Sequence, residues 1–199
     1  MIEFEGWPKT PRLNKTVVYT EKLDGTNAAV VIEEIDDPSM YEYDDKYYDI
    51  GAQSRNRLIT PSDDNHGFAR WVSSNAQGLI ATLGPGRHFG EWYGSGIGRG
   101  YGLTKGDKRF ALFNTARWWT IENLNRVSEV PGLECVTVLG IQPFSVETAK
   151  FYVEELRQFG SEHVPGFMRP EGVCVFHTAS RQVYKTFLEN DEVPKGRDG

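Results

Sequence analysis

Cysteine is scarce in this 199-residue chain, and long apolar runs are absent. Cys135 and Cys174 lie far apart without companions at metal-ligand spacing, which predicts reduced core residues of a cytosolic protein. No segment reaches the roughly 20 apolar residues of a membrane span. The N-terminal stretch MIEFEGWPKTPRL carries acids in place of a secretory apolar core. The sequence therefore predicts a cytoplasmic protein that does not associate with membranes.

Basic residues are also in the minority, with 22 Lys and Arg against 28 Asp and Glu and a net charge of −6. This balance argues against a protein that coats nucleic acid non-specifically. Residues 33–49 alone hold eight acids and one lysine, so the rest of the chain carries a net charge of +1. We expect residues 33–49 to form a solvated loop or long hairpin. Residues 96–109, GIGRGYGLTKGDKR, are where we most expect a basic groove.

Apolar residues divide the chain into segments of strand and helix character. The pattern predicts strands at 16–33, 49–54, 87–92, 108–114, 133–140, 171–177 and 182–187, and helices at 64–83 and 145–159. Asp24 and Gly25 interrupt the first run and predict a tight β-hairpin. Because the helices fall between groups of strands, the expected fold class is α+β, with mainly antiparallel sheets and flanking helices. We expect one domain at 1–188 and a polar C-terminal tail at 189–199.

Lys22 stands directly before the Asp-Gly pair, at the end of a strand of otherwise buried character. A lysine amine is a nucleophile only in its neutral form, which burial and neighbouring cations favour. The ordinary alternative is a strand-edge lysine whose ammonium group reaches out to water. The pattern Lys-x-Asp-Gly alone is too short to decide between the two.

Five further positions carry side chains that could handle a nucleotide. Arg55 of SRNR could grip a phosphate or ribose, Phe113 of RFALFN could stack on a base, and Lys185 could meet a phosphate. Glu91 is an unexpected acid among apolar and glycine residues, and Glu171 opens a buried strand as a candidate metal ligand. Each also fits an ordinary surface or core role. No dinucleotide-binding or P-loop glycine pattern stands in the required place, so neither fold is supported.

The order of these elements is more informative than any one of them. They run Lys-x-Asp-Gly at 22–25, Ser-Arg at 54–55, Gly-Glu-Trp at 90–92, Phe-Ala-Leu-Phe at 110–113, Glu-Gly-Val at 171–173, and then Lys185. This order resembles the covalent nucleotidyltransferase superfamily, which contains ATP-dependent DNA ligases, RNA ligases and mRNA capping enzymes. The stretches EKLDGTN, GEWYG and EGVCVF look most like small phage-type RNA ligases, and Asn27 stands where capping enzymes usually carry arginine.

The resemblance implies the nucleotidyltransferase fold of ligase adenylation domains and the activity of an ATP-dependent RNA ligase. Lys22 matches the lysine that attacks the α-phosphate of ATP, releases pyrophosphate and retains AMP as a lysyl-AMP phosphoramidate. AMP then passes to a 5′-phosphate end, and a 3′-hydroxyl displaces it to seal the strand. The implied cofactors are ATP and Mg²⁺ or Mn²⁺. The implied partner is a nucleic acid with 5′-phosphate and 3′-OH ends, RNA in preference to DNA, as in RNA repair.

The same resemblance assigns roles to the motif residues. Lys22 and Lys185 would be catalytic, with Lys185 touching the α-phosphate. Glu171 would help to hold the divalent cation. The expected nucleotide-binding residues are Glu21, Asp24, Gly25, Arg55, Glu91 and Phe113. Among them, Glu21 is expected beside adenine through its backbone, Arg55 at the ribose or phosphate, Glu91 at the ribose hydroxyls and Phe113 on the face of adenine.

The chain departs from the family pattern in two ways. Motif V usually has two lysines two residues apart, but Val183 and Phe187 flank Lys185 at that spacing, so one phosphate contact is missing or comes from Arg181 or another residue. Only a short tail follows, so we expect no separate OB or C-terminal domain and a monomer. The alternatives are a self-adenylating adenylyltransferase with a non-nucleic-acid acceptor, or a non-catalytic nucleotide-binding module.

Overall fold

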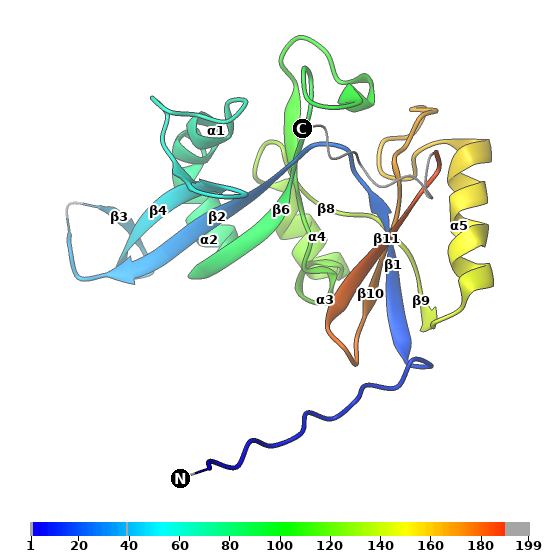
Figure 1. The fold of residues 1–199 in the computed structure, drawn as a ribbon. Helices are drawn as coiled ribbons and strands as arrows, with labels where there is room; N and C mark the ends of the chain where they lie inside the picture. The colour runs from blue at the N-terminus through cyan, green and yellow to red at the C-terminus, as the bar shows by residue number, and fades with distance from the viewer. Residues whose placement is uncertain (1, 39, 190–199) are drawn as a thin grey trace, which may run out of the picture.

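Two β-sheets form the framework of the computed structural model, which describes residues 2–38 and 40–189 (Figure 1). The smaller sheet contains, in spatial order, β11 (Gln182–Phe187), β10 (Gly172–His177), β1 (Thr16–Lys22) and β9 (Val138–Pro143). The larger sheet contains β3 (Tyr41–Tyr43), β4 (Lys46–Ser54), β2 (Thr26–Ile35), β6 (Gly86–Gly94), β7 (Lys108–Leu112) and β8 (Leu133–Cys135), with β5 (Leu58–Ile59) paired to β4. Within these described strands, only β7 and β8 pair in parallel. The predicted α+β class with mainly antiparallel sheets is therefore confirmed.

One face of the larger sheet is covered by helices. Alternate residues of β2, such as Val30 and Ile32, pack with Phe68 of α1 (Phe68–Ser74) and Leu79 of α2 (Ala76–Leu83). Trp118 of α3 (Thr115–Trp118) and Val127 of α4 (Ile121–Ser128) extend the same core. The intervening strand residues, which include Ala29 of β2, point to the opposite side. We call that side the open face of the larger sheet.

The smaller sheet packs one face against α5 (Val146–Phe159). Tyr19 and Val175 from the sheet meet Val153 and Leu156 of the helix in a second buried cluster. Ser145 caps α5, because its side-chain oxygen accepts a hydrogen bond from the Thr148 backbone N–H at 3.3 Å, which confirms the helix start expected from the sequence.

The predicted hairpin at Asp24 and Gly25 is wrong. β1 pairs with β10 and β9 in the smaller sheet, whereas β2 pairs with β4 and β6 in the larger one. The residues between β1 and β2 therefore carry the chain from one sheet to the other. The expected strand at 133–140 divides in the same way into β8 and β9. In both cases, long-range strand pairing overrides the local sequence pattern.

Other expected elements need smaller corrections. The helix predicted at 64–83 is two helices, because Asn75 takes non-helical angles of φ −116° and ψ 14° between α1 and α2. Gly84, with φ 66°, ends α2 as expected. Helices α3 and α4 were not predicted. The acidic residues 33–49 do form a long hairpin from the end of β2 through β3 into β4, apart from position 39, which lies outside the described residues.

Outside these elements, the N-terminal segment extends away from the two sheets (Figure 1). Its hydrophobic side chains Phe4 and Trp7 are almost fully exposed. Residues 190–199 of the predicted polar tail lie outside the described residues. Within the described part of the chain, every helix is too short or too polar to cross a membrane.

A substitution at Gly172 should test how closely β10 and β11 are packed. A Cβ atom at Gly172 would lie 2.1 Å from the Thr186 carbonyl oxygen, so the strands must separate to accept it. We predict that Gly172→Ala lowers the free energy of unfolding by about 1–3 kcal/mol, the usual cost of overpacking. Gly51→Ala is the matched control, because a Cβ there meets nothing within 4 Å. Equal denaturation midpoints for the two variants would contradict the packing argument.

Candidate active site

Lys22 lies at the end of β1 and forms an ion pair with Glu171. Its Nζ atom is 2.5 Å from Oε2 of Glu171, and the two side chains are 20% and 6% exposed. Lys22 is paired in register with Gly172, so Glu171, the residue just before β10, is placed beside it. The sequence-predicted nucleophile and metal ligand are therefore in direct contact at the edge of the smaller sheet.

Lys185 and Phe187 lie on the same face of this sheet as Lys22. The Nζ atoms of Lys22 and Lys185 are 5.5 Å and 5.3 Å from the centre of the Phe187 ring. An aromatic face attracts cations, so the ring holds two ammonium groups near one point. Phe187 occupies a position at which the family pattern would allow a second lysine. The sequence analysis missed this contact, although the two-residue spacing from Lys185 already placed both on one face.

Neither Arg181 nor Val183 supplies a second cation here. Arg181 lies in the turn before β11, next to the first part of β11, which pairs with His177. The Lys22 end of the sheet is instead aligned with Phe187, at the other end of β11. Val183 is exposed on the strand and carries no charge. In the described part of the chain, Lys185 therefore remains the cation that β11 brings toward Lys22.

Glu91 reaches the same site from β6 of the larger sheet. Its two carboxylate oxygens accept hydrogen bonds from the Gly25 backbone N–H and the Asn27 side chain, both at 3.1 Å. Burial raises the pKa of Glu91 to about 7, although the positive charge of Lys22 and the Gly25 hydrogen bond act in the opposite direction. Glu91 is thus held at the start of β2 by two hydrogen bonds and lies near enough to Lys22 to be affected by its charge.

Asp24 and Gly25 secure the crossing between the sheets. The Asp24 carboxylate accepts a hydrogen bond from the Arg99 backbone N–H at 3.1 Å and lies 3.6 Å from the Arg99 guanidinium. A Cβ at Gly25 would lie 2.4 Å from the Trp92 carbonyl oxygen, so the crossing can approach β6 only because residue 25 is glycine. The observed contacts of Asp24 and Gly25 are within the protein, and their expected part in nucleotide binding stays a prediction.

The glycine-rich segment after β6 contacts the backbone at Lys22 and Asp24. The Tyr101 hydroxyl donates a hydrogen bond to the Lys22 carbonyl oxygen at 3.3 Å and accepts one from the Asp24 N–H at 3.1 Å. Arg99 also donates to the carbonyl oxygens of Arg169 and Pro170. Residues 96–109 were predicted to form a basic groove. Arg99 in this segment instead makes its contacts within the protein, so part of the segment has a structural role.

Arg55 and Phe113 lie together on the open face of the larger sheet. Both border a shallow pocket of about 250 Å³, which Asn27 also lines. The strand register explains the grouping, because Asn27 is aligned with Glu91 across β2 and β6. Phe113 follows β7 and is 42% exposed, so its ring is available to a ligand. The structure therefore brings Arg55, Glu91 and Phe113 to one face, which the sequence could not show.

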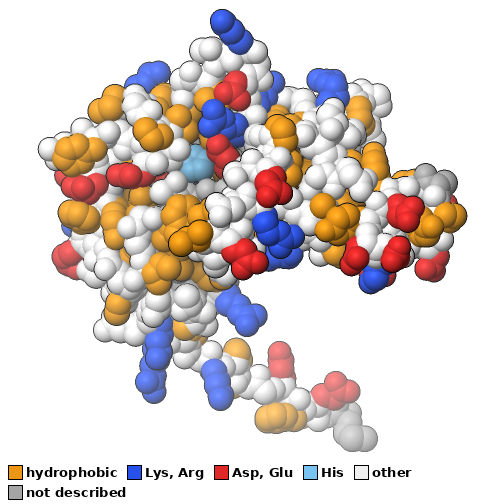
Figure 2. Space-filling view, turned by 180° about the vertical axis from the view of Figure 1, so that it is seen from behind, with side chains coloured by type: hydrophobic (Ala, Val, Ile, Leu, Met, Phe, Trp, Pro, Cys, Tyr) orange, Lys and Arg blue, Asp and Glu red, His pale blue; other side chains and the backbone are white. Residues whose placement is uncertain are grey.

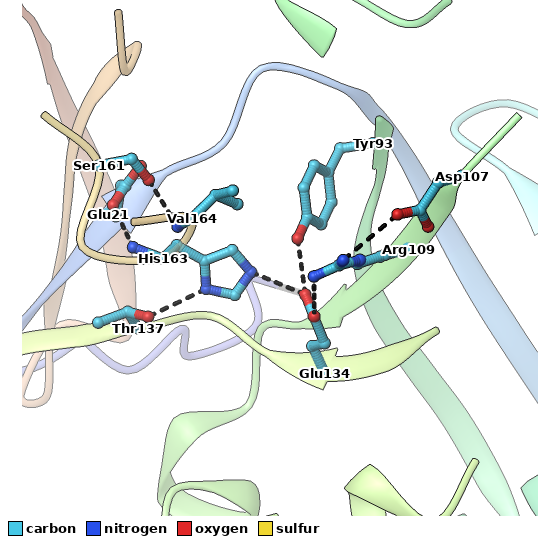
Figure 3. A network of polar contacts seen from close by, with 9 residues as sticks. All are labelled: Glu21, Tyr93, Asp107, Arg109, Glu134, Thr137, Ser161, His163 and Val164. Atoms are coloured by element: carbon cyan, nitrogen blue, oxygen red, sulfur yellow. Dashed lines mark hydrogen bonds and ion pairs between the residues drawn. The ribbon is translucent and has the colours of Figure 1, made fainter. Parts of the chain in front are cut away.

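Glu21 points away from Lys22 into the interior. Its carboxylate accepts hydrogen bonds from the Ser161 hydroxyl at 2.6 Å and the His163 backbone N–H at 2.9 Å (Figure 3). Burial raises the pKa of Glu21, while these hydrogen bonds lower it. The Glu21 side chain is therefore structural, and its expected backbone contact with adenine remains a prediction.

The His163 ring continues this network to the larger sheet. Its nitrogens lie 3.0 Å from the Thr137 hydroxyl and 3.1 Å from a Glu134 carboxylate oxygen (Figure 3). The Tyr93 hydroxyl donates to the same carboxylate at 2.6 Å. Burial alone would raise the pKa of Glu134, but the hydrogen bonds from His163 and Tyr93 hold it below its ordinary value. These contacts connect β8 of one sheet to the residue beside Lys22 in the other.

The residues near Lys22 suit a metal ion that is shared with phosphate oxygens. No group of three or more His, Cys, Asp or Glu residues is assembled for a metal among residues 2–38 and 40–189. Mg²⁺ is commonly held by one or two carboxylates together with substrate phosphates. The single carboxylate of Glu171 is therefore enough for such a site. The thiol of Cys174 lies close enough to Lys22 and Lys185 to sense their charges, but burial raises its pKa to about 11. A neutral thiol is a poor metal ligand.

Replacing Glu91 by glutamine should change how stability depends on pH. The pKa of Glu91 is higher in the folded protein than in the unfolded chain, so folding binds a proton between about pH 4.5 and pH 7. The stability of the wild type should therefore fall, relative to Glu91→Gln, as the pH rises through that range. Parallel stability curves for the two proteins from urea denaturation at several pH values would contradict this assignment.

Comparison with solved structures shows a related fold. A Naegleria gruberi RNA ligase variant with AMP and manganese gives a TM-score of 0.55 at 18% identity, covering 88% of this chain and 50% of that one. Two further variants of the same enzyme, each with ATP and manganese, give TM-scores of 0.53 and 0.55, both at 18% identity, with 90% and 89% of this chain and 52% and 51% of theirs covered. This chain thus spans about half the length of these relatives.

The comparison with curated protein sequences gives no match. The model of the RNA ligase family, in contrast, matches residues 15–192, which include all of the motif residues named above. That match extends over most of the chain and agrees with the shared fold. The chain therefore belongs to the RNA ligase family.

Proposed function

We propose that this protein is an ATP-dependent RNA ligase that works through a lysyl-AMP intermediate on Lys22. The observation that carries the proposal is the meeting of Lys22 and Glu171 from one sheet with Glu91 from the other. A protein that only bound nucleotides would have no need of a lysine held at this point. The ATP and manganese present in the related Naegleria enzyme support the same chemistry.

In the first step, the Lys22 amine forms a bond to the α-phosphorus of ATP. The bond from that phosphorus to the pyrophosphate oxygen breaks, and its electron pair leaves with pyrophosphate. The amine attacks in its neutral form, so the proton of the Lys22 ammonium passes to solvent before the bond forms. Glu171 would hold a divalent cation here, and the cation would neutralise the phosphate charge that would otherwise repel the nucleophile.

The surrounding residues have distinct parts in this proposal. Lys185 approaches the α-phosphate from β11, and the Phe187 ring keeps it near Lys22. Glu91 accepts hydrogen bonds from the ribose, whose hydroxyls would join the Gly25 and Asn27 donors already present. Arg55 contacts the ribose or a phosphate, and Phe113 stacks on adenine from the open face.

Several finer points belong to the proposal as well. The acceptor is a 5′-phosphorylated RNA end joined to a 3′-hydroxyl, and Mg²⁺ or Mn²⁺ is the metal. The protein acts as a cytoplasmic monomer, in a repair role like that of phage-type ligases. A gel assay with 5′-phosphorylated RNA and DNA oligonucleotides tests the acceptor. Transfer of AMP to a small molecule or protein instead would favour the alternative adenylyltransferase.

Replacing the nucleophile should abolish the covalent step. We predict that Lys22→Ala forms no labelled adduct with [α-³²P]ATP and Mg²⁺ on a denaturing gel, because the attacking amine is removed and Lys185 serves only to bind phosphate. Lys46→Ala is the matched control, since Lys46 pairs with Glu34 on the surface. An adduct of undiminished intensity in Lys22→Ala would exclude Lys22 as the nucleophile.

Removing the Glu171 carboxylate should alter the metal requirement. We predict that Glu171→Gln slows lysyl-AMP formation about 10²- to 10³-fold. Raising Mg²⁺ or Mn²⁺ should restore only part of the rate, because one metal ligand is lost. Glu154→Gln on α5 is the surface control. A metal titration with the same midpoint in wild type and Glu171→Gln would remove Glu171 from the metal site.

A further inference from the structure

The open face of the larger sheet continues beyond the candidate active site along β6. Strand alternation places Arg87, Phe89 and Glu91 on this face, while Trp92 packs under the helices. Glu91 lies beside Lys22, so Phe89 and Arg87 follow at increasing distance from the nucleophile. We call Arg87 and Phe89 the β6 track. It is continuous with the site but extends past it.

Small residues flank the β6 track on the neighbouring strands. Phe89 is aligned with Ala29 of β2, which is in turn aligned with Gln53 of β4. Arg87 is aligned with Val31, and Val31 with Gly51, where a Cβ would meet nothing within 4 Å. On the β2 side, the side chains of Phe89 and Arg87 therefore stand beside the shorter side chains of Ala29 and Val31.

Both track residues have exposed side chains. Phe89 is 53% exposed and borders the same shallow pocket as Gln53 and Phe113. Arg87 is exposed at the next position on this face, and no ion pair joins it to another residue in the described ranges. An exposed ring followed by a guanidinium group fits single-stranded nucleic acid, whose bases stack on aromatic rings and whose phosphates attract cations.

Charge on the rest of the molecule favours this location. Glu33 and Asp49 are aligned with each other on β2 and β4, one step beyond Val31 and Gly51, and they would repel a phosphate backbone. On the face shown in Figure 2, basic side chains are interspersed with acidic ones and form no broad basic surface. A bound strand would therefore turn away from this acidic end and run along the β6 track toward Lys22.

We propose that the β6 track binds a single-stranded RNA segment next to the end that is joined. Phe89 stacks on an unpaired base, and Arg87 contacts a phosphate of the same strand. This inference rests on the proposed function for the identity of the strand, but binding along the track needs neither ATP nor covalent chemistry. RNA bound along the β6 track would have its end directed toward Lys22.

Equilibrium binding in the absence of ATP tests the track directly. The probe is a fluorescent, 5′-phosphorylated single-stranded RNA oligonucleotide, and affinity is measured by anisotropy. Phe89→Ala should weaken binding about 5- to 100-fold, the range for loss of one stacked base. Phe151→Ala on α5 is the matched control, because Phe151 is 55% exposed but distant from the larger sheet. Equal affinities for the two variants would overturn the proposal.

The contact of Arg87 with a phosphate can be tested by the salt dependence of RNA binding. Arg87→Ala should lower the slope of log affinity against log salt by about 0.7, the value for one phosphate contact on a single strand. Arg157→Ala on α5 should leave that slope unchanged. Arg87→Ala should also form lysyl-AMP at the wild-type rate, because Arg87 lies outside the nucleotide site. An unchanged salt slope, or loss of lysyl-AMP formation in Arg87→Ala, would contradict its assigned contact.

A double-mutant cycle distinguishes stacking from a general loss of binding. The RNA affinities of the wild type and Phe89→Ala are measured for a series of oligonucleotides, each with a single abasic position at a different place in the sequence. At one position, the missing base should lower the affinity of the wild type but cause no additional loss of affinity in Phe89→Ala. Independent, additive losses at every position, or no measurable RNA binding by the wild type, would overturn the proposal. Failure of the wild type to form lysyl-AMP would instead count against the proposed function and leave the binding result intact.

Discussion

The contact between Lys22 and Glu171 is the interaction on which the rest of the site depends. Two largely buried opposite charges are tolerated in a fold only if each has a partner of opposite charge. Lys22 and Glu171 are such partners, since their charged atoms are 2.5 Å apart. Glu171 reaches Lys22 because the next residue, Gly172, is paired with Lys22 between β10 and β1. The pair therefore fixes the position of the Lys22 amine at the end of β1.

The segment that leads into Glu171 connects the two sheets around this contact. Ser161 and His163 of that segment bind Glu21 next to Lys22, and Phe167 packs at 4.6 Å, between ring centres, on Tyr101. Tyr101 in turn binds the Lys22 carbonyl oxygen. Lys22, Glu171 and the larger sheet are therefore joined by one connected set of contacts. A loss of any of them would move Lys22 relative to Glu91.

Local pattern predicted much of this structure and failed where long-range pairing decided. Helix α5 followed from its apolar spacing and Ser145 cap, and β10 and β11 from their alternation. The Asp24–Gly25 turn signal was real, but no sequence window shows that the flanking strands pair elsewhere. The motif residues Lys22 and Glu171 could be chosen by resemblance. Phe187 could not, because its role comes from facing two lysines across the same sheet.

Mapping the covalent adduct tests the account most directly. The wild-type protein would be incubated with ATP and Mg²⁺, digested under conditions that preserve phosphoramidates, and sequenced by tandem mass spectrometry. The account predicts one adenylyl group, carried by the peptide that contains Lys22 and absent when ATP is omitted. An adenylyl group on Lys185 or another residue, or its absence under all metal conditions, would contradict the assignment of Lys22 as the nucleophile.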